Sequence, residues 1–341
     1  MTFAQTKIQR PRPRAGLMLA RPALERELVA ALSAQRVVLV CAPAGYGKTA
    51  LLARALEQLP AGHAAAWVAL DPGDDLHRLL ECLLAALEAF DPPWRTAPEG
   101  LMATAVHGGD AARGPVVDEL VNTLEACEIA HGVIVLDDLH HVDDPACLAF
   151  LERLLQRLGA RWTVAIAARH EPALRLARLR AGGELADLGP EALRFTLEEA
   201  RELLARAGID ARAADALHER TAGWPAGLRL ALNGAPGAGG AIDRAAFAFL
   251  ASEVVARTAP QLREFLLLTS VLHELDEPRC AALTGDPFAA ARLEEIERLG
   301  LFATVVDDAR RTLRLHDLFR DALQHMLRLE RRDVWLAQLR R

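Results

Sequence analysis

Eight consecutive residues, Ala42-Pro-Ala-Gly-Tyr-Gly-Lys-Thr49, have the composition of a loop that binds phosphate. They follow the apolar run Val37–Cys41 and precede a segment whose apolar residues recur at helical spacing, so the order is strand, glycine-bearing loop and helix. In that context backbone N–H groups wrap a β-phosphate, and the positive end of the helix dipole faces it. Ala42 replaces the first glycine of the strict pattern, and alanine is small enough for that position. The alternative is a chance glycine turn before a surface lysine, which the flanking periodicity disfavours.

The side chains at the end of this loop have the chemistry that a nucleoside triphosphate requires. Lys48 would reach the β- and γ-phosphates, and the hydroxyl of Thr49 would ligate Mg²⁺. The expected nucleotide-contacting residues of the loop are Ala44, Gly45, Tyr46, Gly47, Lys48, Thr49 and Ala50. The loop therefore predicts a nucleotide cofactor together with Mg²⁺.

Two carboxylates follow a later apolar run, Ile134-Val-Leu-Asp-Asp138, which has the Walker B pattern. At the carboxyl end of a central strand, Asp137 would hold Mg²⁺ through its water shell beside Thr49. Asp138 would orient or deprotonate the attacking water. A strand that merely ends in an acidic turn is the alternative, and the upstream phosphate loop makes it the weaker one. His140 and His141 follow without metal-ligand spacing, so we interpret them as loop residues that pack near the site.

Arg169 ends the apolar run Thr163–Ala168. Because the carboxyl ends of parallel strands share one edge of the sheet, this cation could contact the γ-phosphate. An ordinary arginine at a strand end is equally compatible with the sequence. We include Arg169 with Asp137 and Asp138 as a candidate catalytic residue.

Strands and helices alternate from Leu24 to Arg169, which predicts a parallel sheet with helices on both faces. Strands are expected at 37–41, 65–70, 132–137 and 163–168, with a short last strand at 193–195. Helices are expected from Leu76 to Leu87 and after Asp144-Pro145, and a loop is expected from 91 to 114. The fold class is thus an α/β P-loop NTPase with an AAA-like sheet.

The second half of the chain is predicted to be helical. Thr196-Leu-Glu-Glu199 is a capping box, a second helix starts at Asp210, and a third follows Gly223-Trp-Pro225. Several short helices and then two strands, 301–306 and 312–315, predict a winged helix. The expected domains are a basic arm (1–23), a nucleotide-binding domain (24–195), a small helical domain (196–233), a linker (234–241), a winged-helix domain (242–330) and the start of a further C-terminal region (331–341). The arm is either solvated or in contact with nucleotide or a partner.

Bulk composition excludes several classes of protein. The net charge of -6 gives no general reason to expect nucleic-acid binding. The five cysteines are scattered without a CxxC pair, which indicates a reducing compartment and no zinc site. No apolar run approaches the roughly 18 residues of a membrane span, and the N-terminus lacks the apolar core of a signal peptide. We therefore expect a cytoplasmic protein with no membrane partner.

Taken together, these motifs resemble the STAND class of signalling ATPases, and within it the large ATP-binding LuxR-type bacterial regulators of the maltose-regulon activator kind. The similar elements occur in the family's order along nearly the whole chain. They are Ala42–Thr49, Ile134–His140, the strand ending in Arg169, Leu193-Arg-Phe195, Gly223-Trp-Pro225 and Leu315–Arg320.

The resemblance implies three domains folded over one adenine nucleotide, ATP or ADP, with Mg²⁺. In that arrangement Pro225 would lie against the adenine, His316 would reach the β-phosphate of ADP, and residues near Arg21 would help to cover the base. Such proteins rest on ADP, open on ATP when a small-molecule or protein inducer binds a C-terminal sensor, and then self-associate. They hydrolyse ATP slowly and bind DNA through a domain that this chain lacks, so we expect this chain to be the front module of a longer protein.

One alternative is an AAA-type initiator or loader, which would bind DNA through its winged helix. The helix in the reading position, Phe288–Leu299, holds Arg292 and Arg298 against three glutamates. A major-groove helix should be basic, because phosphate neutralisation supplies most non-specific affinity. A metabolic kinase is a third possibility, but nothing besides Asp138 offers a base that would activate an acceptor.

Overall fold

A computed structural model describes residues 3–11, 19–206, 208–232, 251, 255–256, 258–272, 274–299, 301, 303–307, 312–315 and 317–331. The chain forms two compact units. The first contains Met1–Ala42 and Lys48–Ala192, and the second contains Pro43–Gly47 and Leu193–Arg341. The five-residue segment Pro43–Gly47 therefore packs with the second unit, although both of its neighbours in sequence belong to the first.

A five-stranded parallel sheet is the centre of the first unit. Its strands are β1 (Val37–Cys41), β2 (His63–Ala69), β3 (His131–Asp137), β4 (Trp162–Ala168) and β5 (Leu185–Leu188), in the order β2-β3-β4-β1-β5. β3 and β4 are buried along their whole length, as expected of strands covered on both faces. The predicted α/β fold class is confirmed, and the first four strands lie within two residues of their predicted bounds.

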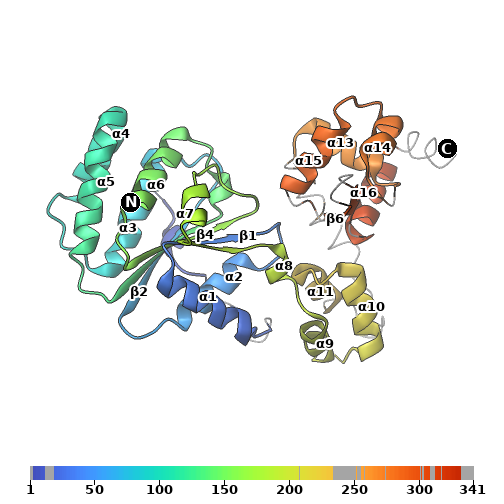
Figure 1. The fold of residues 1–341 in the computed structure, drawn as a ribbon, viewed down its shortest axis with the longest axis horizontal. Helices are drawn as coiled ribbons and strands as arrows, with labels where there is room; N and C mark the ends of the chain where they lie inside the picture. Colours follow the sequence, from blue (N-terminus) through green and yellow to red (C-terminus); the bar gives the residue numbers. More distant parts are fainter. Residues whose placement is uncertain are drawn as a thin grey trace. The chain divides into compact units, whose positions relative to one another are not determined.

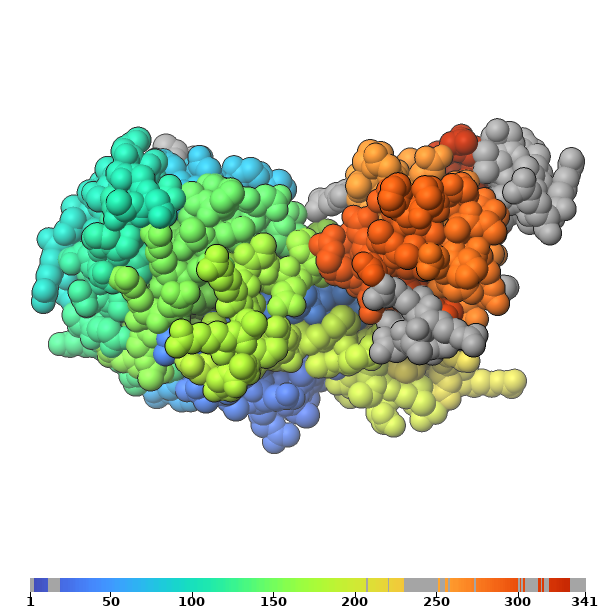
Figure 2. Space-filling model, turned by 45° about the horizontal axis from the view of Figure 1, so that its top comes forward, coloured from blue at the N-terminus to red at the C-terminus, as the bar shows by residue number. Residues whose placement is uncertain are grey.

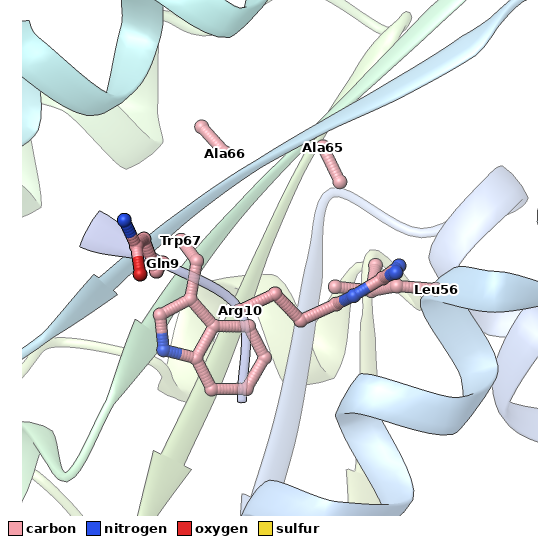
Figure 3. Close-up of a pocket in the computed structure, with 6 residues that line it drawn as sticks. All are labelled: Gln9, Arg10, Leu56, Ala65, Ala66 and Trp67. Atoms are coloured by element: carbon pink, nitrogen blue, oxygen red, sulfur yellow. The ribbon is translucent and has the colours of Figure 1, made fainter. Parts of the chain in front are cut away.

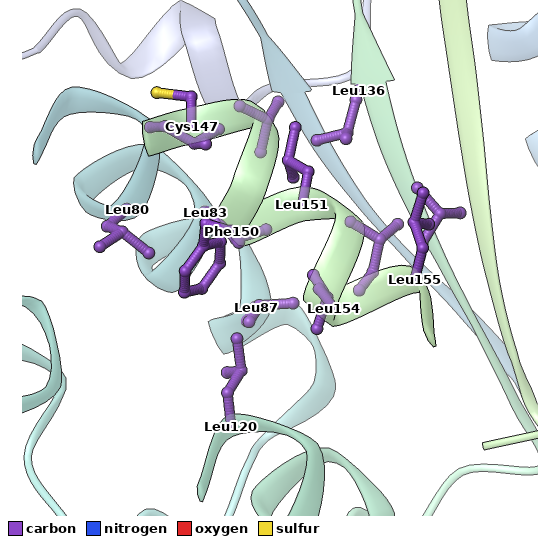
Figure 4. Packing of buried hydrophobic residues seen from close by; sticks show 14 of the residues in the cluster. Leu80, Leu83, Leu87, Leu120, Leu136, Cys147, Phe150, Leu151, Leu154 and Leu155 are labelled. Carbon is purple, nitrogen blue, oxygen red and sulfur yellow. The ribbon is translucent and has the colours of Figure 1, made fainter. Parts of the chain in front are cut away.

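Helices cover both faces of this sheet (Figure 1). α1 (Pro22–Ala34) and α2 (Lys48–Glu57) lie on one face, and α3 (Leu76–Leu87) and α6 (Pro145–Arg157) lie on the other. Figure 4 shows leucines of α3 and α6 meeting around Phe150, which is fully buried. Asp144 joins the two helices, because its carboxylate accepts hydrogen bonds from Ala146 N (2.9 Å) and from Leu76 N (3.0 Å).

The last predicted strand was wrong. The fifth strand is β5, whereas Leu193 ends the short helix α8 (Pro190–Leu193) and no strand follows it up to Thr196. β5 lies at an edge of the sheet and contains Asp187, which pairs with Arg180 of α7 (Ala177–Ala181) at 2.8 Å. β5 has only four residues, and Asp187 interrupts the apolar run by which the other four strands were recognised.

The predicted loop from 91 to 114 was also wrong in part, because most of it is helical. η2 (Glu88–Phe90) is followed by α4 (Pro98–His107) and α5 (Gly109–Glu125). Pro98 occupies the first turn of α4, where a missing N–H costs no helical hydrogen bond. The two helices pack on each other at the surface of the unit, in teal in Figures 1 and 2. The burial of Leu101, Ala105 and Leu120 therefore stabilises helices in this segment despite its glycines and prolines.

The N-terminal arm is held against the edge strand β2 over its first described residues. η1 (Gln5–Ile8) packs on β2 and α3, and Lys7 Nζ pairs with Asp74 (2.6 Å) and Asp71 (3.0 Å). Beside it lies a cavity of about 460 Å³ lined by Gln9, Arg10, Leu56, Ala65, Ala66 and Trp67. The Arg10 side chain extends past the Trp67 ring toward Leu56 (Figure 3).

The second unit contains two groups of helices. The first is α9 (Leu197–Ala205), α10 (Ala211–Thr221) and α11 (Pro225–Leu232), and the predicted capping box at Thr196 and Glu199 is present. The second is α13 (Pro260–Thr269), α14 (Glu277–Thr284), α15 (Ala289–Arg298), the antiparallel strands β6 (Ala303–Asp307) and β7 (Thr312–Leu315), and α16 (Asp317–Glu330).

Leu275 adds a bridge to β7 through two hydrogen bonds with Leu313. A three-helix and hairpin unit of this kind is a winged helix, which confirms that part of the fold class. The described part of the chain has no helix with the length and apolar character to traverse a bilayer.

Replacing Gly132 by alanine should destabilise the first unit by about 1–3 kcal/mol, because a side chain there overpacks a core. Gly132 lies in β3, and an added Cβ would overlap the ring of Trp162, which is fully buried. Gly100→Ala in α4 is the control, since the nearest atom to its added Cβ, Thr96 Cγ2, lies at an ordinary contact distance of 3.6 Å. It should stabilise by about 0.5–1 kcal/mol. Equilibrium urea unfolding measures both, and equal stabilities of the two variants would contradict the expectation.

Candidate functional site

The phosphate loop connects β1 to α2 with two glycines in the left-handed region, Gly45 (φ 80°) and Gly47 (φ 79°). Residues with a side chain adopt that region only rarely and at a cost in strain, so the backbone favours glycine at both positions. Ala42 is different, because its N–H donates to Ala168 O (3.1 Å) and continues the pairing of β1 with β4. Ala42 does not have a positive φ, which explains why alanine can replace the first glycine of the motif.

Lys48, the first residue of α2, is buried with only 7% of its surface exposed. Its Nζ donates to the carbonyl oxygen of Ala42 at 2.6 Å. Burial lowers the pKa of Lys48 to about 8, while the charge of Asp138 raises it and that of Arg169 lowers it further. The ammonium group of Lys48 is thus held at the start of the loop by Ala42, and the charges of Asp138 and Arg169 both act on it.

Thr49 and Asp137 lie next to each other, as the sequence predicts. The Thr49 hydroxyl donates to Asp137 Oδ1 at 3.0 Å, and Asp137 is the last residue of β3. Burial, with the adjacent charge of Asp138, raises the pKa of Asp137 to about 6. One hydroxyl and one carboxylate fit Mg²⁺, which binds through few protein oxygens and completes its shell with phosphate and water. The described residues include no group of three or more His, Cys, Asp and Glu side chains with metal-site geometry.

The strand order brings Arg169 into the same region. β4 lies between β1 and β3, so Arg169 follows the strand between the phosphate loop and the two carboxylates. Asp138 has a left-handed backbone (φ 57°) at the turn into η3 (Leu139–His141), and its side chain is 40% exposed. The structure therefore gathers Lys48, Thr49, Asp137, Asp138 and Arg169 at the carboxyl edge of one sheet.

His140 is unusual among the neighbours of this cluster. Its side chain is only 6% exposed, and within the described chain neither ring nitrogen has a hydrogen-bond partner. The rings of His141 and His170 lie 4.0 and 5.8 Å from its ring, centroid to centroid. Burial lowers the pKa of His140 to about 2, and the positive charges near it add to that effect. The imidazole is therefore neutral, consistent with packing beside the site.

The segment Pro43–Gly47 of the loop also accepts hydrogen bonds from the turn before α11, which belongs to the same compact unit. Trp224 Nε1 donates to Ala44 O at 3.1 Å, and Ala226 N donates to Gly45 O at 3.0 Å. Sequence reasoning singled out the Gly-Trp-Pro turn for Pro225 and missed Trp224. A bulky aromatic residue between glycine and proline was the available signal, but its partner lies 180 residues away in sequence.

The remaining predicted residues have the following positions. Pro225 is buried at the start of α11. Arg21 precedes α1, where its backbone N–H donates to Glu25 Oε1 and its guanidinium donates to Ala192 O (3.3 Å). Leu193-Arg-Phe195 meets the Gly-Trp-Pro turn, since Phe195 N donates to Gly223 O at 2.8 Å. His316 lies outside the described residues.

Comparison with known families and structures agrees with the fold described above. Residues 21–167 match the family described as AAA ATPase domain, and residues 251–335 match the MalT winged helix domain. Among solved structures, a Walker-type ATPase of Pyrococcus abyssi is similar in fold with a TM-score of 0.60. The match covers 92% of this chain and 98% of that one at 14% sequence identity.

Two kinds of curated relatives align with nearly the whole chain. The serine/threonine-protein kinase PknK of Mycobacterium tuberculosis is 33% identical over 94% of this chain and 30% of its own length. The HTH-type transcriptional regulator MalT of Klebsiella pneumoniae is 28% identical over 98% of this chain and 39% of its own length. The chain thus spans about a third of the length of these relatives.

Replacing His140 by phenylalanine should weaken the acid sensitivity of the fold. A histidine whose folded pKa lies far below its unfolded value of about 6.5 loses stability as pH falls, because the unfolded chain takes up the proton first. Between pH 7 and pH 5 the variant should lose about 2 kcal/mol less stability than the wild type. Some loss should remain, since burial and His63 also lower the pKa of His131. Urea unfolding at the two pH values measures the difference, and equal losses would contradict this account.

Proposed function

Since the chain joins an AAA ATPase domain to a MalT winged helix domain and is homologous to the MalT-type transcriptional regulators, we propose that it is a nucleotide-gated switch. Its ligand is ATP or ADP with Mg²⁺, and hydrolysis is slow. The observation that carries the proposal is the charged cluster at the edge of the sheet, where the buried Lys48 lies within reach of Asp138 and Arg169 and Thr49 bonds to Asp137.

Each member of the cluster has a role that follows from its chemistry. Lys48 neutralises the phosphates, and Thr49 with Asp137 supplies oxygen atoms to the metal ion, which screens the phosphate charge when bound. Asp138 is the more exposed carboxylate and accepts a proton from the attacking water or orients it. Arg169 stabilises negative charge that develops on the γ-phosphate.

The electrostatics of α15 argue against the alternative of an initiator or loader that reads DNA with this winged helix. Arg292 lies 3.3 Å from Asp286 and 3.5 Å from Glu295, and Arg298 lies 3.9 Å from the same glutamate. Both arginines of the helix therefore have acidic partners on their own surface. A helix that neutralises phosphates needs cations that are available to the DNA.

We further propose that ADP marks the resting state and that ATP, together with an inducer, marks the active and self-associating state. The homology to MalT-type regulators supports this part. This chain aligns with about two fifths of MalT, and the rest of MalT has other tasks. Inducer recognition and DNA binding are then functions of regions beyond this chain. Contacts of Pro225 and Arg21 with the base, and of His316 with the β-phosphate, belong to the same proposal.

Removing the Lys48 ammonium should abolish stabilisation by nucleotide. At a concentration 100-fold above Kd, ADP should stabilise the wild type by about 2.7 kcal/mol, and Lys48→Ala should remove most of this gain. Lys7→Ala is the control, because Lys7 is the other lysine of the chain and pairs with Asp71 and Asp74. It should lower the baseline stability and keep the nucleotide effect. Thermal unfolding with and without ADP measures the effect. If ADP raised the melting temperature of Lys48→Ala as much as that of the wild type, the assignment of the phosphate loop would be refuted.

Replacing Asp138 by asparagine should separate binding from hydrolysis. Asparagine keeps the shape but cannot accept a proton, so we expect a loss of hydrolysis of about 10²-fold or more with ATP affinity changed less than about threefold. Single-turnover hydrolysis and ATP titration measure the two effects. The wild type itself should turn over below the roughly 1–100 s⁻¹ of kinases, and a rate within that range would count against a switch.

A further inference from the structure

The phosphate loop receives two hydrogen bonds from the turn that starts α11. The indole Nε1 of Trp224 donates to Ala44 O at 3.1 Å, and the backbone N–H of Ala226 donates to Gly45 O at 3.0 Å. Both acceptors are main-chain carbonyls, and they belong to consecutive peptide groups. Pro43–Gly47 packs in the same compact unit as this turn.

These two bonds also fix the direction of two N–H groups. A trans peptide is planar, so its N–H points opposite to its C=O. The carbonyl of Ala44 shares its peptide with the N–H of Gly45, and the carbonyl of Gly45 shares its peptide with the N–H of Tyr46. When the turn holds the two carbonyls on one side of the loop, both N–H groups are directed to the other side. Those N–H groups are among the donors that a phosphate loop offers.

The fit at Gly45 is close. A Cβ added to Gly45 would lie 2.6 Å from Ala226 Cβ and 2.7 Å from the Trp224 ring, so the turn rests directly on the bare Cα. Gly47 has a similar backbone (φ 79° against 80°) but nothing within 4 Å of an added Cβ. The two glycines therefore differ in packing and not in φ.

The turn itself is rigidly built. Trp224 is 3% exposed, and its backbone N–H donates to Thr221 O at 3.0 Å. Gly223 has φ 70° and accepts a hydrogen bond from Phe195 N, while Phe195 O is bonded to the ring of His218 at 2.9 Å. A side chain held in this way can orient a partner, because little freedom is lost when the bond forms.

We propose that Trp224 and the first turn of α11 are positioning elements of the phosphate site. They orient the N–H groups of Gly45 and Tyr46 before nucleotide arrives. This inference rests on the proposed nucleotide function and adds a way in which phosphate binding is regulated. Coupling between two sites is reciprocal, so phosphate bound to the loop must in turn stabilise the contact with α11. Displacement of the helical group α9–α11 from the loop would weaken phosphate binding without touching the nucleotide.

The first test removes the indole N–H and keeps the aromatic ring. Trp224→Phe should raise the Kd of both ADP and inorganic pyrophosphate by about 5-fold, the usual effect of one hydrogen bond. Trp94→Phe is the matched control, since it also deletes an indole N–H, which there donates to Glu88 Oε1 on the exposed surface. It should leave both values unchanged. An effect on ADP alone would mean that Trp224 acts on the base, and no effect on either ligand would also overturn the proposal.

The second test needs no nucleotide and so separates this inference from the proposed function. Gly45→Ala should push Ala226 away and speed hydrogen exchange at its amide and in α11. Gly47→Ala places a side chain at nearly the same positive φ without the clash and should leave exchange in α11 as in the wild type. Mass spectrometry of the full chain measures both. Equal exchange in α11 of the two variants would overturn the proposed contact. If the variants differed clearly but the chain bound no ADP, the proposed nucleotide function would be refuted and the contact between Gly45 and α11 would stand.

Discussion

The buried ammonium group of Lys48 is the constraint on which the α/β unit depends. A charge taken out of water is costly unless opposite charge and hydrogen bonds lie close to it. The Ala42 carbonyl supplies one bond, and the carboxylates of Asp137 and Asp138 supply the opposite charge. That arrangement requires β1 and β3 to end at the same edge of the sheet, with β4 between them. Parallel strands and the helical crossovers that join them are the architecture that meets this requirement.

Local patterns were sufficient to predict most of the elements around the site. Continuous apolar runs identified four of the five strands, and Asp144-Pro145 and the Thr196 capping box gave the starts of α6 and α9. Lys48, Thr49, Asp137, Asp138 and Arg169 were predicted to come together from one rule about strand ends. Each of these signals depends on residues within one turn or one strand, where the sequence carries the information directly.

The failures have a common physical cause, which is packing between distant segments. α4 and α5 form because Leu101, Ala105 and Leu120 are buried, although glycine and proline are frequent in their sequence. β5 is an edge strand of four residues interrupted by Asp187, and it is defined by its pairing with β1. The bond from Trp224 to Ala44 depends on groups that only the folded chain brings together. No local period or spacing encodes such contacts.

The turn before α11 contacts the loop through main-chain oxygens, and this has a consequence for how the loop can vary. Every residue has the same main-chain carbonyl group. The hydrogen bonds from Trp224 and Ala226 therefore do not discriminate among side chains at positions 44 and 46. It discriminates only against any side chain at Gly45, where a methyl group already collides. This contact therefore leaves the side chains at positions 44 and 46 unconstrained, whereas at position 45 it requires a hydrogen atom where any other residue has its Cβ.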